Sequence, residues 1–267
     1  MSPVPSADSR RPAIPRDLAR VGRLGAAGYA RYRWMRLRNR IFRLVNLVGP
    51  ARHRCPCCGW RGARFLDFVR ETRVTPGIVC PRCRSQPRHR ALSAFLVDHL
   101  ATLPVDAAVL HFAPERALVR VFAQSPRLRY VGVDRDRRAR DLRADVTALP
   151  FRAETFNLVL SCHLLEHVRD DTAALAEMAR VTIPGGSVLI MAPTVRDCET
   201  RPTIAFAEPD WQGHWRNYGC DLLDRLEAMK LRARLVWLAR VLPPGQQAEL
   251  AVHPEPLFIG EKPARPS

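Results

Sequence analysis

Residues 154–193 read ETFNLVLSCHLLEHVRDDTAALAEMARVTIPGGSVLIMAP and contain a complete strand–helix–strand pattern. The apolar run 156–161 has the length of a buried strand, whereas residues 171–181 repeat apolar side chains at helical spacing. A second apolar run, 187–191, follows Gly185-Gly186, which would turn the chain into the next strand. This order predicts two parallel strands joined by a helix that packs on their sheet.

The same alternation extends towards the N-terminus. Earlier runs predict strands at 107–112 and 130–133, and a shorter, less apolar run predicts one at 142–146. Residues 91–103 predict a helix that ends before Pro104. Strands alternating with helices indicate an α/β fold in which helices cover both faces of a parallel sheet. Ligands bind such sheets at the carboxyl ends of the strands.

Two acidic residues stand at those strand ends. Asp134 follows the strand 130–133 and lies 23 residues after His111. An acidic side chain at this place can accept hydrogen bonds from both hydroxyls of a ribose. Asp145 ends the next strand and could accept a hydrogen bond from an adenine amine, while the backbone N–H of Val146 could donate to the ring. The two carboxylates therefore predict a site for an adenosine group.

These motifs together resemble those of class I S-adenosylmethionine-dependent methyltransferases of the type 11-like family, over residues 105–240. The resemblance rests on Asp134, on Asp145-Val146, on FNLVLSCHLLEHV at 156–168 and on PGGSVLI at 184–190. The chain is also similar to a bacterial group of methyltransferases that carry an N-terminal CxxC…CxxC segment and an HFAPE loop, here residues 111–115. The resemblance implies S-adenosylmethionine as cofactor and a Rossmann-like sheet of seven strands with helices on both faces.

The first loop departs from the general pattern of the class. An acidic residue followed by Gly-x-Gly is usual, but here His111 replaces the acid, and Ala113 and Glu115 stand at the glycine positions. Glycine lets the backbone approach the cofactor, which Ala113 and Pro114 restrict, whereas Glu115 could accept the amino group of the methionine moiety. The residues that we expect to bind the cofactor are His111, Phe112, Ala113, Pro114, Glu115, Asp134, Asp145, Val146 and Ser161.

The chemistry requires a nucleophile held in line behind the reactive methyl group and, for a hydroxyl acceptor, a base. His163, just past a predicted strand, is the first candidate for a catalytic residue, and His214 is the second. The segment HWRNYG at 214–219 matches a pattern of the bacterial group. Its Arg216 and Tyr218, together with His167, are candidates to bind an anionic or sugar-like acceptor; all of these side chains could equally be structural.

Four of the eight cysteines form two CxxC pairs, Cys55 with Cys58 and Cys80 with Cys83. Each such turn can aim two sulfurs at one point, so the pairs predict a structural zinc ribbon with four thiolate ligands over residues 51–90. Cys57 could replace Cys58 as a ligand, but Cys58 preserves the spacing. Four buried free thiols and, less favoured, an iron–sulfur cluster are the alternatives. The expected domains are an arm and basic helix over 1–50, this module, and the methyltransferase domain over 91–267.

The net charge of +17 belongs almost entirely to the first 100 residues, which hold 21 arginines against five acidic residues. Residues 1–16 are rich in Pro, Ser and Arg and are expected to be disordered. Residues 31–48 predict a basic amphipathic helix whose apolar stripe is expected to pack on the protein, although peripheral membrane contact or nucleic acid could also use it. The chain shows no secretory core or transmembrane run, so we expect a cytoplasmic protein.

Three functions are compatible with this sequence. Methyl transfer to a small-molecule or sugar-type acceptor is favoured by the resemblance and by the balanced charge of residues 101–267. RNA methylation would use the basic front of the chain and the zinc ribbon to hold phosphates, but no basic-aromatic RNA-binding motif is present, so nucleic acid is a less favoured partner. A zinc-bearing binding protein without catalysis would follow if the altered first loop had lost the cofactor.

Overall fold

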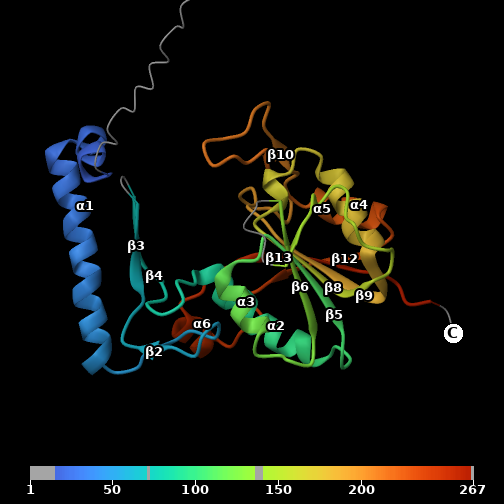
Figure 1. Cartoon of the computed structure of the whole chain (residues 1–267), viewed down its shortest axis with the longest axis horizontal. Helices are drawn as coiled ribbons and strands as arrows, with labels where there is room; N and C mark the ends of the chain where they lie inside the picture. Colours follow the sequence, from blue (N-terminus) through green and yellow to red (C-terminus); the bar gives the residue numbers. More distant parts are fainter. Residues whose placement is uncertain (1–15, 71–72, 136–140, 266–267) are drawn as a thin grey trace, which may run out of the picture.

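The computed structural model describes the chain except for residues 1–15, 71–72, 136–140 and 266–267. Its centre is a seven-stranded sheet with the order β12-β13-β9-β8-β5-β6-β7 (Figure 1). The strands are β5 (Ala108–Phe112), β6 (Arg129–Asp134), β7 (Leu142–Arg143), β8 (Phe156–Cys162), β9 (Thr182–Met191), β12 (Arg232–Trp237) and β13 (Pro256–Glu261). β13 runs antiparallel to the other six strands, which are parallel to one another. The expected seven-stranded α/β sheet is confirmed.

Helices cover both faces of this sheet (Figure 1). They are α2 (Pro87–Ala101) and α3 (Arg116–Phe122) on one face, and α4 (Asp171–Val181) and α5 (Asp221–Ala228) on the other. Successive side chains of a strand point to opposite faces. Val109 of β5 accordingly joins the core cluster of α2 and α3 with Leu118, whereas Leu110 joins the cluster of α4 and α5 with Met178. Two cores of apolar side chains therefore hold one sheet.

The sequence pattern located most of these elements. Helix α4 covers residues 171–181 as expected, and α2 begins four residues earlier than the apolar pattern, at Pro87. The strand expected over 142–146 was wrong in extent: β7 ends at Arg143, and Asp145 makes an isolated bridge with Ala148 across a turn. Strand β9 starts before the glycine pair, with a register shift against β8; Gly185 has a φ of 78°, which favours glycine at this irregularity.

Helix α1 (Arg16–Val48) stands beside β3 at the edge of the molecule (Figure 1). The side chains of Asn39 and Asn46 each exchange two hydrogen bonds with the backbone of the next module, at Asp67 and Arg64 respectively, over distances of 2.9–3.0 Å. Because this polar face docks, the expectation that the apolar stripe packs on the protein was wrong. The exposed stripe residues are Trp34, Leu37, Ile41, Leu44, Val45 and Val48.

Helix α1 extends beyond the expected bounds and contains a kink at Gly25. The arm that we expected to be disordered lies, as residues 1–15, outside the described residues. None of the helices in the described ranges is both long enough and apolar enough to cross a membrane.

The cysteine module carries two small antiparallel ribbons. They are β1 (His53–Arg54) with β2 (Arg61–Gly62), and β3 (Leu66–Val69) with β4 (Val74–Val79). Its Cys55, Cys80 and Phe65 belong to the same buried cluster as Leu92 of α2 and Leu118 of α3. The module therefore shares a hydrophobic core with one face of the sheet.

Arg90 joins this module to the C-terminal part of the chain. Its fully buried guanidinium group donates to the backbone carbonyls of Ile78 and Ser85 in the module, and to those of Leu250 and Ala251 at the end of α6 (Pro244–Leu250). Burial lowers the pKa of Arg90 to about 10, so it remains charged at neutral pH. A charged side chain with four carbonyl acceptors can be buried at this depth because its donors are satisfied.

Candidate functional site

A cavity of about 510 Å³ opens at the carboxyl ends of the parallel strands. The strand order reverses between β5 and β8, which is where ligands bind in open α/β sheets. The lining residues come from the ends of β5 and β6, from the turn after β7, from the segment after β8, and from one tryptophan. They are Phe112, Ala113, Val133, Asp134, Arg135, Ala144, Asp145, Val146, Thr147, Leu164, His167, Val168, Arg169, Asp170 and Trp215. This volume is in the range of small-molecule sites.

The two carboxylates expected to bind adenosine both line this cavity. Asp134 is the last residue of β6, and Asp145 follows β7 in the turn that shortens that strand. The backbone N–H and the hydroxyl of Thr147 donate to Oδ1 of Asp145, at 3.0 Å and 2.8 Å, and these bonds lower the pKa of its carboxyl. Asp145 is therefore an ionised acceptor at neutral pH, and its bonds to Thr147 use only Oδ1.

The residues of the first loop line two different hollows. Phe112 and Ala113 line the cavity, whereas Pro114 and Glu115 line a different hollow, between α3 and the cysteine module. Ala113 adopts a φ of 45°, in the left-handed region that favours glycine. The chain therefore keeps a glycine-like backbone at a position where the class usually has glycine.

Glu115 contacts the helix that follows the cysteine module. Its carboxylate lies 3.1 Å from the Arg88 guanidinium and 2.8 Å from Nε2 of His89, and the thiol of Cys162 donates to it at 3.3 Å. Burial opposes ionisation of Glu115, but His89, Arg88 and Cys162 together hold the pKa of its carboxyl well below the usual range. Glu115, expected to face the methionine moiety, thus ties the first loop to α2.

His89 is the neutral partner in this contact. Its Nδ1 accepts the backbone N–H of Gln86 at 2.9 Å, so its proton is on Nε2, which faces Glu115. Burial lowers the pKa of His89, in agreement with this tautomer. The charge on Glu115 is balanced by Arg88.

Two of the expected cofactor residues lie inside the protein. His111 is fully buried on β5, where Nδ1 is 2.9 Å from the hydroxyl of Tyr130 and the ring packs against Phe122. Ser161 is fully buried on β8, beside Phe112 in the sheet register. Neither residue lines the cavity, because both belong to the sheet interior.

The candidate base His163 lies immediately after β8, with a φ of 52°. Its Nδ1 is 3.1 Å from Oε1 of Glu166, whose side chain is fully buried in the short helix η1 (Leu165–His167). His163 is half-buried and does not line the cavity, whereas His167, expected to bind the acceptor, does. The burial of Glu166 was not expected from the sequence, because it stands among the polar residues that precede α4.

The HWRNYG segment contacts the residues that follow β8. The ring of His214 lies 4.8 Å from that of His167, centroid to centroid. Arg216, in β11 (Arg216–Asn217) opposite β10 (Ile204–Ala205), pairs with Asp171 at 3.0 Å and donates to the carbonyls of Val168 and Arg169. It therefore holds the start of α4 and does not line the cavity, so the expected contact with an acceptor is not found.

Tyr218 lies wholly inside the protein, and its hydroxyl donates to Oδ2 of Asp171 at 2.7 Å. Burial and the Asp171 carboxylate raise the pKa of Tyr218, so the phenol stays protonated. Its position corrects the expectation of contact with an acceptor: the side chain anchors α4.

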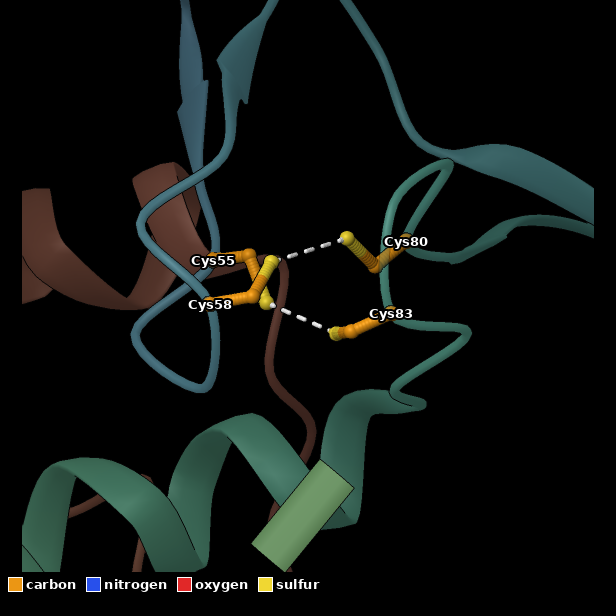
Figure 2. Close-up of side chains that lie close together, drawn as sticks. All are labelled: Cys55, Cys58, Cys80 and Cys83. Carbon is orange, nitrogen blue, oxygen red and sulfur yellow. Dashed lines mark hydrogen bonds between the residues drawn. The ribbon is translucent and has the colours of Figure 1, made fainter. Parts of the chain in front are cut away.

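The four paired cysteines point towards one another (Figure 2). The sulfurs of Cys55 and Cys83 are 3.6 Å apart and those of Cys58 and Cys80 are 3.8 Å apart (Figure 2), and all four lie within 4.8 Å of one another. Tetrahedral zinc with bonds of about 2.3 Å requires sulfurs about 3.8 Å apart. Cys57 instead directs its thiol at the carbonyl of His89. The donor set fits a structural zinc ion held by Cys55, Cys58, Cys80 and Cys83.

Sequence reasoning missed part of the cavity wall. Trp215 and Arg169 face each other, with the guanidinium carbon 5.3 Å from the ring centroid, and both line the cavity. The backbone N–H of Trp215 donates to the carbonyl of Glu166, which brings the later segment to the end of β8. Trp215 stood in the HWRNYG segment, but nothing in the local pattern indicated which of its residues would turn towards the cavity.

Comparisons with known proteins cover much of the chain that forms this cavity. Residues 107–190 match the family model described as a methyltransferase domain. The chain is 40% identical over 67 residues to demethylmenaquinone methyltransferase of Streptomyces avermitilis, which is 25% of this chain and 23% of that protein. It is 35% identical over 66 residues to norajmaline N-methyltransferase of Rauvolfia serpentina, which is 25% of this chain and 22% of that protein. The match spans less than a quarter of either relative.

Solved structures of similar fold include 1,6-didemethyltoxoflavin-N1-methyltransferase of Burkholderia thailandensis, with a TM-score of 0.47 and 20% identity, covering 66% of this chain and 78% of that one. A SAM-dependent methyltransferase of Archaeoglobus fulgidus has a TM-score of 0.46 and 12% identity, covering 68% and 96%. The family match at 107–190 contains β5, β6, β7 and β8, whose ends form the cavity. Residues 107–190 are therefore similar to a methyltransferase domain.

Proposed function

We propose that this protein transfers a methyl group from S-adenosylmethionine to a small-molecule or sugar-type acceptor. The observation that carries the proposal is the placement of Asp134 and Asp145 on one cavity at the ends of neighbouring strands β6 and β7. Both carboxylates can accept hydrogen bonds from the groups of adenosine, and most of the cavity wall lies within residues 107–190, which match the methyltransferase domain model.

Asp134 is the acceptor for the ribose hydroxyls, because a carboxylate can take two hydrogen bonds from a diol. Oδ2 of Asp145 is the acceptor for the adenine amine, since Thr147 occupies Oδ1. Phe112 and Leu164 supply apolar walls for the ring. The bound cofactor supplies an activated methyl group on a positively charged sulfur, so the protein's task is to orient the acceptor and receive a proton.

His163 is the proposed base for that proton. With Nδ1–H donated to Glu166, the lone pair of the neutral ring is on Nε2. The side chain of Glu166 holds the ring in this orientation, as the carboxylate partner of a catalytic histidine does. His214 is then a supporting residue, and Pro114, Glu115, His111 and Ser161 shape the loop and strands from outside the cavity.

The class of acceptor is inferred from the net charge of residues 101–267 and from the names of two relatives. Residues 101–267 are nearly neutral, unlike the basic front of the chain, and a near-neutral net charge favours a small acceptor over a polyanion. Both named relatives carry small-molecule names, demethylmenaquinone and norajmaline. These observations support a small-molecule acceptor over nucleic acid, and they support catalysis over a binding protein without a cofactor.

Calorimetric titration of the zinc-replete protein with S-adenosylhomocysteine tests the cofactor site. The wild type is expected to bind at micromolar affinity, and Asp134→Ala to lose at least tenfold, since a hydrogen bond to a charged group contributes about 1.5–3 kcal/mol. Asp98→Ala, on α2 and away from the cavity, is the matched control and should bind like the wild type. A folded wild type that does not bind would refute the proposed function.

A further inference from the structure

A second set of metal-binding side chains lies against the cofactor cavity. Glu166, His167 and His214 each offer one ligand atom, and these three atoms lie within 4.8 Å of one another. Glu166 and His167 come from η1, and His214 comes from the segment 47 residues further along the chain. His167 also lines the cavity, so an ion here would face the bound ligands.

The buried carboxylate of Glu166 points to a missing partner. Its Oε1 contacts Nδ1 of His163 at 3.1 Å, but its Oε2 is buried without a hydrogen-bond partner. The residue is fully buried, and a buried carboxylate oxygen without a partner is costly. A cation bound by Oε2 would remove that cost.

Both histidines present the ring nitrogen that a metal needs. Nδ1 of His167 lies 3.0 Å from the carbonyl of Gly213, and a carbonyl only accepts, so Nδ1 carries the proton. The lone pair of the neutral ring is therefore on Nε2. Nδ1 of His214 similarly faces a carboxylate oxygen of Asp210, at 3.6 Å. An oxygen on the far nitrogen is the usual second partner of a metal-binding histidine.

The segment that carries His214 is held in place by further bonds. Asp210 accepts the backbone N–H groups of Gln212 and His214 at 2.8 Å and 2.9 Å. The neighbouring Trp215 donates its backbone N–H to the carbonyl of Glu166 at 2.8 Å. The two chain segments that supply ligands are thus bonded to each other without the ion.

We propose that Glu166, His167 and His214 form a divalent-cation site, distinct from the four-cysteine site, on the wall of the cofactor cavity. Two imidazoles and one carboxylate suit zinc, iron, cobalt or manganese, and three protein ligands leave coordination positions open. His163, whose Nδ1–H donates to Oε1, is a positioning residue that turns Oε2 towards the ion.

The proposed cation site indicates which chemical group of the acceptor is methylated. This inference rests on the proposed function. An acceptor hydroxyl bound to the ion would lose its proton more readily, as metal-bound water does. The acceptor oxygen then forms a bond to the methyl carbon, the carbon–sulfur bond breaks with its electron pair on sulfur, and the proton leaves to His163 or water. The expected reaction is O-methylation of a hydroxylated small molecule.

Cobalt(II) titration tests the site, using tag-free protein that holds one zinc per chain at the cysteine thiolates and has been freed of more weakly bound zinc by dialysis against citrate. The wild type is expected to show visible cobalt absorption that saturates at one additional ion per chain, without thiolate-to-cobalt charge transfer. His167→Ala removes an exposed ligand with little risk to folding, and Glu166→Gln keeps the shape of the buried one. Each should weaken cobalt binding at least tenfold.

His99→Gln is the matched control, because His99 lies on α2 near the opposite ends of the strands, against Ser187. It should bind cobalt like the wild type. Absence of an additional cobalt ion in the wild type, or equal affinity in His167→Ala, would overturn the cation site. Calorimetry with S-adenosylhomocysteine on the same samples separates the two ideas: cofactor binding without cobalt binding refutes the cation site alone.

Discussion

Ala113 shows how a single residue departs from its family pattern while keeping the required backbone. The residue occupies the left-handed region, with a φ of 45°, at the end of β5. A side chain with a Cβ atom costs about 1–2 kcal/mol in this region, whereas glycine adopts it readily. The first loop therefore holds local strain next to the cofactor cavity.

Replacing Ala113 by glycine should relieve this strain. We expect Ala113→Gly to raise the free energy of unfolding by about 1 kcal/mol, measured by urea denaturation. Ala117→Gly is the control, because Ala117 is buried within α3 and should lose about 1 kcal/mol. Equal destabilisation by both changes would contradict the strain at Ala113.

Glu115 gives a pH dependence of stability. Because its pKa is lowered in the folded protein, its ionic contacts stabilise the fold above the pKa of an unfolded glutamate, about 4.3, and are lost progressively as the pH falls below it. Glu115→Gln should lower the free energy of unfolding by about 1–3 kcal/mol at pH 7. The difference between wild type and variant should shrink towards pH 3, whereas a constant difference would contradict this account.

At the scale of single residues, the sequence predicted which carboxylates stand at strand ends, but it did not predict which way several other side chains point. Asp134 and Asp145 were located because strand ends are recognisable from apolar runs. The burial of Tyr218 and the orientation of Glu115 depend on Asp171 and Arg88, which lie far away in the sequence. Tertiary contacts of this kind leave no local signal.

Among the elements, the long periodic ones were predicted and the short ones were not. Helix α4 was located to the residue because its apolar spacing spans three turns, whereas β7 contains only two residues, which pair with β6 at the edge of the sheet. The exposure of the apolar stripe of α1 could not be predicted, because the hydrogen bonds of Asn39 and Asn46 to the cysteine module decide which face of the helix packs on the protein. The CxxC pairs identified the cysteine module from spacing alone.

The choice between adjacent cysteines is a prediction at this scale. Cys58→Ala should retain well under one zinc per chain after dialysis against citrate, and should unfold at a lower temperature, since structural zinc contributes folding energy. Cys57→Ala is the matched control and should retain one zinc, because its thiol faces the carbonyl of His89. Zinc content from elemental analysis decides between them, and loss of zinc from Cys57→Ala with retention in Cys58→Ala would reverse the ligand assignment.

In the whole molecule, the cysteine module, the sheet and the first loop form one connected structure. Arg90 bonds the module to α6, the buried cluster around Phe65 continues to β5, and Arg88 and His89 reach Glu115 beside the cavity. The four-cysteine module thereby supports the first loop beside the cavity. The overall α/β architecture was predicted from the alternation of strands and helices, whereas this connection was not, because it joins residues about 160 positions apart.

The central claim is that the cavity at the ends of β5, β6 and β7 binds the cofactor. A crystal structure of the zinc-replete protein grown with saturating S-adenosylhomocysteine tests it most directly. The account predicts density for the ligand in this cavity, with both ribose hydroxyls on Asp134 and the adenine amine on Asp145. An empty cavity at saturating ligand, or the ligand bound elsewhere, would contradict it.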